Sequence, residues 1–228
     1  MLCREVIYVE PIKTRKIKDP GSAITHFIGM LMAIAATAPL IIKAHTGVQS
    51  GTVAAAWIFI ISMILLYGAS TTYHTFDRSD RVNKILKKLD HSMIFVLIAG
   101  TYTPVCILGL GNRLGYILLV TIWSIAALGI TFKLCWVTCP KWISSVMYIL
   151  MGWLCMIAAP FLIHNLGMGA FRWLLIGGII YTVGGVLYAL KLQKFNEQHP
   201  VFGTHEIFHL FVMGGSFCHF MMVYLYLV

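Results

Sequence analysis

Long apolar segments that recur along the chain constrain its fold more than any other feature of the sequence. Each has about 20 residues and is rich in Leu, Ile, Ala and Gly, enough for a helix to cross the ~30 Å hydrocarbon core of a membrane. Helices satisfy their own backbone hydrogen bonds, whereas the strands of a membrane barrel alternate in character over ~10 residues. We therefore predict an all-α bundle of seven transmembrane helices. The predicted spans are 23–43, 52–73, 92–110, 115–133, 142–163, 172–191 and 205–227.

The composition leaves almost no room for a soluble part. Hydrophobic residues make up 59% of the chain and charged residues 11%, against about a quarter charged in soluble domains. The first apolar stretch is too long for the core of a signal peptide and has no small-residue cleavage site after it. We predict an N-terminal segment, 1–22, and a seven-helix domain, 23–228, in the cell membrane.

Basic residues indicate the orientation of the bundle. All but three of the 17 Lys and Arg residues lie in the N-terminal segment or at the ends of, or after, the second, fourth and sixth spans; the exceptions are Lys43, Arg113 and Arg172. Because basic residues stay on the cytosolic side, we expect a cytosolic N-terminus and an external C-terminus. The basic cytosolic segments then account for the net charge of +9 and face anionic headgroups, which predicts membrane lipids as partners and no nucleic acid.

The loop after the second span predicts a helix of its own. Between Asp77 and Asp90, apolar residues recur at i, i+3, i+4 and i+7 and basic residues take the opposite side. That pattern is typical of an amphipathic helix lying in the membrane interface. Ser79 or Asp80 would cap it, and it would carry the chain from His74 to Asp90.

Two of the six cysteines, Cys135 and Cys139, have a helical spacing that resembles half of a metal site. They fall at the cytosolic end of the fourth predicted span, in a reducing compartment, with no partner motif nearby. We interpret them as small apolar filler.

Four metal-competent side chains are predicted to share one depth at the cytosolic edge. The second span ends at His74, the third begins just after Asp90, and the seventh begins with His205 and His209. The i, i+4 spacing of the last two places both imidazoles on one helix face. Three histidines without a fourth protein ligand are the pattern of a zinc ion that keeps an open position. We predict Zn²⁺ at this edge.

Simpler interpretations exist for the individual residues. A single histidine at a membrane edge often only meets headgroups, but ionisable groups inside spans are costly and usually functional, which favours metal binding for the set. Ser70 lies one turn before His74 on the same face. Its hydroxyl could bond a water at the metal or pack against a neighbouring helix, and the sequence favours neither.

Glu206 makes the run from His205 match HExxH, in which Glu is the general base of zinc proteases. Glu206 also suits the positive end of a helix dipole, so Asp90 is the better candidate to orient or deprotonate the water. His26 is a weaker candidate, as a neighbour of the ligands. His219 lies ~21 Å along the helix from His205 and cannot share that ion.

Several motifs occur in order over nearly the whole chain. They are Ser22-Ala23-Ile24-Thr25-His26, Ser70-x3-His74, Leu89-Asp90-His91, His205-Glu206-Ile207-Phe208-His209 and Gly215-Ser216-x2-His219-Phe220. With these motifs the chain resembles the haemolysin-III family, the bacterial branch of the progestin and adipoQ receptor (PAQR) superfamily. It departs from that pattern at Ser22, where the family usually has Asn.

The resemblance implies a seven-helix fold with a cytosolic N-terminus and a zinc ion held by His74, His205 and His209. It also implies that Asp90 contacts the water at the metal. The related adiponectin receptors have Gln at the position of Glu206, which argues against a protease. These relatives imply hydrolysis of lipid amides such as ceramide, and bacterial members are tied to membrane lipid and energy homeostasis.

The leading hypothesis is a zinc-dependent lipid-amide hydrolase or lipid-homeostasis regulator, in which Asp90 and Ser70 position the water. A long acyl chain would occupy a Gly-, Leu- and Phe-lined cavity between the helices. One alternative is a pore-forming, cytolytic protein with structural zinc. A pore would show polar residues along several spans, whereas the polar residues of this chain cluster at one edge. The other is a lipid sensor without turnover.

Overall fold

The computed structural model describes residues 17–47, 49–190, 192–199 and 202–228, and within those ranges all regular structure is helical. In order, the elements are α1 (Pro20–Thr46), α2 (Thr52–Thr75), α3 (Asp80–Pro104), the π-helical turn η1 (Val105–Leu110), α4 (Arg113–Cys135), α5 (Lys141–Trp153), the 3₁₀ turn η2 (Leu154–Ala158), α6 (Ala159–Leu190), α7 (Gln193–Gln198) and α8 (Thr204–Tyr226). The all-α prediction is confirmed. Most of the predicted N-terminal segment, with its basic residues Arg4, Lys13, Arg15 and Lys16, lies outside the described residues, as does Lys191.

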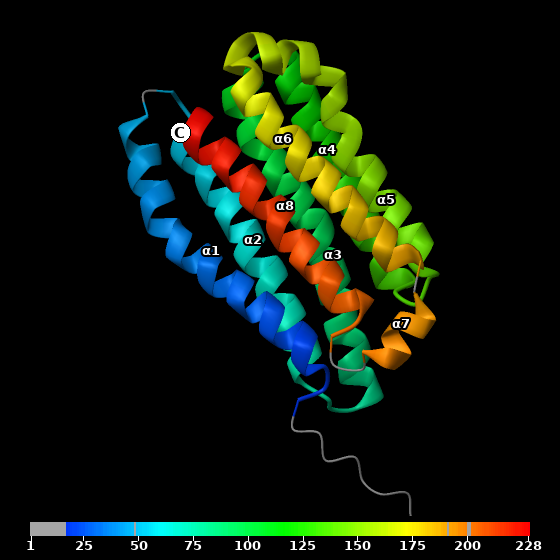
Figure 1. Ribbon diagram of the computed structural model, residues 1–228. Helices are drawn as coiled ribbons and strands as arrows, with labels where there is room; N and C mark the ends of the chain where they lie inside the picture. Colours follow the sequence, from blue (N-terminus) through cyan, green and yellow to red (C-terminus); the bar gives the residue numbers. More distant parts are fainter. Residues whose placement is uncertain (1–16, 48, 191, 200–201) are drawn as a thin grey trace, which may run out of the picture.

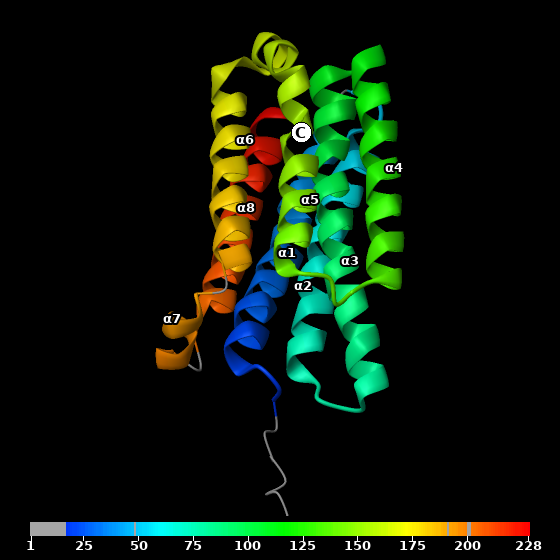
Figure 2. The ribbon, with the colours of Figure 1, turned by 90° about the vertical axis from the view of Figure 1, so that its right-hand side faces the viewer.

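Six stretches of the described helix are long and apolar enough to cross a membrane. One of them, Lys141–Leu190, has 50 residues, more than twice the ~20 that one crossing needs. Gly167 interrupts it with a φ of 79°, a conformation that glycine adopts without strain. Figure 2 shows the chain rising through α5, turning at the top and descending through most of α6. The loop predicted between 163 and 172 is therefore helical on both sides of a single break.

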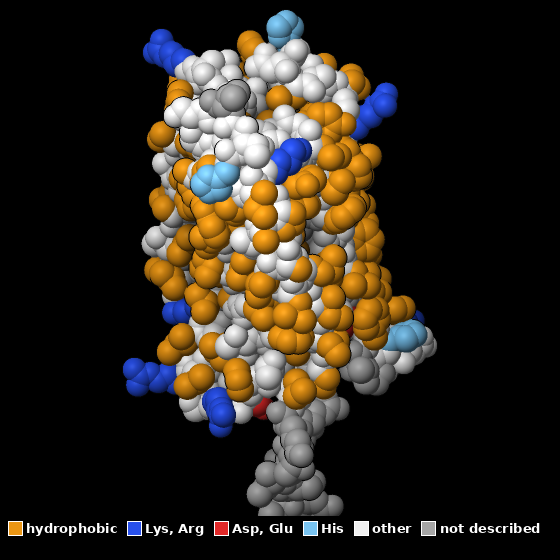
Figure 3. All heavy atoms as spheres, turned by 90° about the vertical axis from the view of Figure 1, so that its left-hand side faces the viewer, with side chains coloured by type: hydrophobic (Ala, Val, Ile, Leu, Met, Phe, Trp, Pro, Cys, Tyr) orange, Lys and Arg blue, Asp and Glu red, His pale blue; other side chains and the backbone are white. Residues whose placement is uncertain are grey.

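Large apolar side chains cover the outside of the bundle. Leu128, Ile42 and Val120 are 71%, 68% and 67% exposed. Figure 3 shows hydrophobic side chains as a broad band across the middle of one face, with Lys and Arg gathered toward its two ends. An exposed apolar surface of that extent, on helices long enough to span the hydrocarbon core, is the surface that faces lipid.

The helices form a ring in the order α1, α2, α3, α5, α6 and α8, and α8 closes it against α1 (Figures 1 and 2). Helix α4 packs outside the ring against α3. At their contact a Cβ atom on Gly129 would lie 2.3 Å from the ring of Phe95. A glycine at this position lets the two backbones approach closely, as small residues do between membrane helices.

The separate interfacial helix predicted for 77–90 is wrong. Its residues form the first turns of α3, which continues without interruption to Pro104 and extends beyond the neighbouring helices at the lower end of Figure 2. No Gly or Pro stands between Asp80 and Ala99, so extending the helix costs less than ending it and starting another. The Ser79 hydroxyl does cap the helix by accepting the N–H of Val82 at 3.4 Å.

The interpretation of Cys135 and Cys139 also needs correction. Cys135 is exposed, whereas Cys139 is buried with its Sγ 3.2 Å from Lys133 Nζ and 3.3 Å from Ser144 Oγ. The ammonium of Lys133, fully buried at the end of α4, donates to both groups. Cys139 is therefore a polar partner of a buried lysine and not apolar filler.

Candidate metal centre

His74, His205 and His209 lie together at one end of the bundle, where α2 ends and α8 begins. One nitrogen from each lies within 4.8 Å of the others. The Nε2 atoms of His74 and His205 are 3.1 Å apart, close to the ~3.4 Å that separates two ligands of a tetrahedral zinc with Zn–N bonds of about 2.0–2.1 Å. The convergence expected from topology is therefore present, and the role of these residues as ligands stays a prediction.

Asp19 orients the imidazole of His74. Its Oδ2 lies 2.9 Å from His74 Nδ1. Asp19 N–H donates to the His74 carbonyl at 2.9 Å and Lys18 N–H to the Thr75 carbonyl at 3.2 Å, so this segment satisfies carbonyls that the end of α2 leaves free. With Nδ1–H donating to the carboxylate, Nε2 presents its lone pair to the centre. Beside it, burial of Lys18 over the Tyr73 ring lowers the pKa of its ammonium group.

Thr25 orients His209 in the same way. Its Oγ1 lies 3.0 Å from His209 Nδ1 and also 3.0 Å from the carbonyls of Gly21 and Ser22. Carbonyls only accept, so the single hydroxyl proton goes to these carbonyls, which leaves the Thr25 oxygen to accept from Nδ1–H. Nε2 of His209 is then the nitrogen with a free lone pair. Two of the three histidines are thus held in the tautomer that metal binding requires.

His26 packs directly against this group. Its ring stacks on that of His209 with centroids 3.6 Å apart and planes 9° from parallel, and it meets the edge of Tyr67 at 5.1 Å. The side chain is buried, and neither ring nitrogen has a hydrogen-bond partner among the described residues. His26 therefore contacts a candidate ligand. The sequence had indicated it as a weaker candidate, for a position next to the ligands.

Glu206 serves the start of α8. One carboxylate oxygen accepts the N–H of Gly203 at 2.8 Å and the other accepts the Ser22 hydroxyl. On the short helix α7, Asn196 Oδ1 accepts the Thr204 N–H at 2.8 Å and the Thr204 hydroxyl at 2.9 Å. These bonds satisfy amides that the first turn leaves free and fix the register of the helix that carries two candidate ligands. The ranking of Glu206 below Asp90 as a general base stays a prediction.

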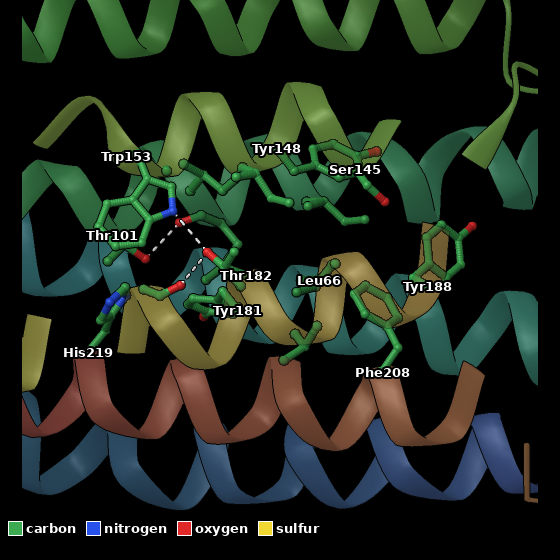
Figure 4. Close-up of a pocket in the computed structure, with 18 of the residues that line it drawn as sticks. Leu66, Thr101, Ser145, Tyr148, Trp153, Tyr181, Thr182, Tyr188, Phe208 and His219 are labelled. Atoms are coloured by element: carbon green, nitrogen blue, oxygen red, sulfur yellow. Dashed lines mark hydrogen bonds between the residues drawn. The ribbon is translucent and has the colours of Figure 1, made fainter. Parts of the chain in front are cut away.

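Asp90 and Ser70 line a cavity that begins beside the three histidines. Asp90 is buried, with its Oδ2 3.3 Å from His91 Nδ1, and Ser70 Oγ has no hydrogen-bond partner among the described residues. The centre of a water molecule can move through a volume of about 130 Å³ inside this cavity. Side chains of α2, α3, α5, α6 and α8 border it. Figure 4 shows part of its lining, in which apolar and aromatic side chains prevail.

The sequence prediction missed Asp19 and Thr25. Asp19 directly precedes the proline that starts α1, a place where an aspartate is usually interpreted as a helix cap. Thr25 stands beside His26 in one of the motifs, which was its only signal. Neither position reveals a histidine partner, because that partner lies on another helix far along the chain.

Residues 14–220 match the family described as Haemolysin-III related. The chain belongs to this family. The Hemolysin-3 homolog of Bacillus subtilis (strain 168) is 41% identical over 211 residues, which cover 92% of this chain and 95% of that protein. Hemolysin-3 of Bacillus cereus is 41% identical over 216 residues, or 94% of each. The adiponectin receptor protein of Drosophila melanogaster is 25% identical over 231 residues, which cover 89% of this chain but 49% of the receptor. This haemolysin-III protein is thus a multi-pass protein of the cell membrane, related at a distance to the PAQR receptors.

Proposed function

We propose that this protein binds one Zn²⁺ through His74, His205 and His209 and hydrolyses a long-chain lipid amide drawn from the membrane. The supporting observation is the pair of contacts from Asp19 and Thr25, which direct two imidazoles toward a common point beside an apolar cavity. When bound by three imidazoles, zinc supplies an activated water and polarises a carbonyl oxygen.

The chain's own residues then have distinct tasks. Asp90 faces the same cavity and would orient the attacking water and accept its proton. The unpartnered hydroxyl of Ser70 would donate a hydrogen bond to that water or to the substrate carbonyl. The apolar lining would hold the acyl chain and keep bulk water away from the reacting bond.

We also propose seven crossings with a cytosolic N-terminus, in which Lys141–Leu190 crosses twice. Ser79 then lies inside the cell and His164, at the opposite end, outside. In intact cells, a membrane-impermeant maleimide should label the variant His164→Cys but not Ser79→Cys. After the cells are opened, the maleimide should label both variants. Labelling of Ser79→Cys but not of His164→Cys in intact cells would refute the orientation.

Asp19→Asn should weaken zinc binding about 10- to 100-fold, because losing the carboxylate that orients a ligand histidine has an effect of that size. The measurement is competition for zinc against a chelator of known affinity. Asp80→Asn is the matched control, since Asp80 is an exposed acid in the first turn of α3. Equal zinc affinity in the two variants would show that Asp19 does not support the metal.

Two alternatives to the hydrolase, a lipid sensor and a cytolytic protein, predict different results with the purified protein. A lipid sensor would bind the amide without turning it over. A cytolytic function, suggested by the name of the Bacillus cereus relative, would release dye from liposomes without requiring Asp90. The cavity favours the hydrolase or the sensor, because its lining is mostly apolar and offers ions little to replace their hydration shell.

A further inference from the structure

His219 lies at the far end of the cavity from the three histidines. It also stands on α8, ~15 Å along the helix axis beyond His209. The side chain is 8% exposed and borders the cavity. Figure 4 shows it with Thr101 at one end of the lining, whereas Tyr188 and Phe208 lie at the other. The cavity therefore connects two polar regions.

The tautomer of His219 follows from its one hydrogen bond. Nε2 lies 3.2 Å from the carbonyl oxygen of Leu174, and a carbonyl only accepts, so Nε2 carries the proton. Nδ1 is then an acceptor. It is buried and has no hydrogen-bond partner among the described residues.

The ring is held firmly in this orientation. A Cβ atom on Gly177 would lie 2.4 Å from His219 Cδ2 and 2.6 Å from Nε2, so only a glycine lets α6 come close enough for the Leu174 bond. The ring of Tyr181 packs beside the imidazole with centroids 5.3 Å apart. Nδ1 therefore cannot readily turn away to find another partner.

Hydroxyl groups near this end of the cavity are already engaged. Thr101 donates to the Leu97 carbonyl at 2.9 Å and Thr182 to the Gly178 carbonyl at 2.7 Å, while Tyr181 pairs with Ser216 at 2.7 Å. A buried acceptor without a donor is costly. A ligand in the cavity can supply the missing donor.

We propose that His219 Nδ1 accepts a hydrogen bond from a hydroxyl group near the far end of a long-chain acyl ligand. This inference rests on the proposed function, which places the carbonyl of the ligand at the three histidines. The rise of ~15 Å along α8 from His209 to His219 equals the half of the ~30 Å hydrocarbon core that one lipid leaflet fills. One acyl chain of ordinary membrane length therefore reaches from the reacting carbonyl to His219. The ligand class is an acyl compound hydroxylated at or near its methyl end.

The test compares the binding of two acids to the purified protein after zinc has been offered, with the bound zinc measured in parallel. The ω-hydroxy form of hexadecanoic acid should bind about 2- to 10-fold more tightly than hexadecanoic acid itself, the range expected for one net hydrogen bond. In His219→Phe and in His219→Leu the hydroxylated acid should lose this advantage or bind more weakly. The control Met156→Leu changes an apolar lining residue and should keep the preference. A general packing defect would alter both affinities together, so the ratio isolates the contact with the hydroxyl group.

The outcomes separate this inference from the proposed function. If wild-type protein binds the two acids equally while it hydrolyses an amide with zinc, the hydroxyl site is wrong and the function stands. Equal binding is also the result expected if a water molecule already occupies Nδ1. A preference for the hydroxylated acid in a protein that holds no zinc would keep the hydroxyl site and reject the hydrolase. Failure to bind either acid would reject the hydroxyl site, and amide turnover with zinc would then decide the proposed function separately.

Discussion

The double variant His205→Ala, His209→Ala should lose its metal, so that zinc falls from about one ion per chain to background, because a single remaining imidazole cannot hold the ion. Its melting temperature should fall as well. A ligand that binds only the folded state adds about 2.7 kcal/mol when its free concentration is 100 times its Kd, and this term disappears with the site. Metal analysis and thermal unfolding in one detergent provide the measurements.

Two controls separate metal loss from damage to packing. His164→Ala, His199→Ala removes two exposed histidines and should leave zinc unchanged. A strong chelator should lower the melting temperature of wild-type protein and have no effect on the variant that lacks His205 and His209. Full zinc occupancy in that variant would show that the metal lies elsewhere or does not exist.

Asp90→Asn should abolish amide hydrolysis while the protein keeps its zinc. Removing a positioned general base typically costs 10²- to 10⁴-fold in rate, and the proposed ligands are untouched. Glu206→Gln should be mild, because the remaining amide oxygen can still accept the Gly203 N–H. The substitution removes a negative charge that stabilises the start of α8 by roughly 0.3–1 kcal/mol. Turnover of a long-chain lipid amide and zinc content are measured side by side.

The comparison between these two carboxylates distinguishes two mechanisms. An inactive Glu206→Gln beside an active Asp90→Asn would favour the chemistry of HExxH proteases, in which the glutamate is the base. Loss of zinc in Asp90→Asn would instead assign this carboxylate to the metal site itself. In wild-type protein, binding without turnover would identify a sensor.

The sequence predicted the parts of this fold that depend on local pattern. Apolar length predicted the membrane helices, and Ser79, one of the two residues expected to cap the helix that follows, does so. Because alternate spans end on the same side of a membrane, topology also predicted that His74 lies close to His205 and His209, and the structure confirms that they lie together.

The sequence could not predict the contacts between segments that lie far apart along the chain. The bonds from Asp19 to His74 and from Thr25 to His209 join residues 55 and 184 positions apart, and no periodicity encodes such pairs. The amphipathic pattern before Asp90 was detected, but the same pattern suits a surface helix and the exposed end of a longer one. Similarly, a lysine at the end of a span looks solvated in a sequence, whereas Lys133 is buried among side chains of the following segment.

The most direct test of the metal centre is X-ray absorption at the zinc edge, measured on the purified protein. The arrangement of His74, His205 and His209 predicts about one zinc per chain with three imidazole nitrogens at about 2.0–2.1 Å and an oxygen in the remaining position. Absence of zinc, or a sulfur ligand at about 2.3 Å, would contradict the site described by these three histidines.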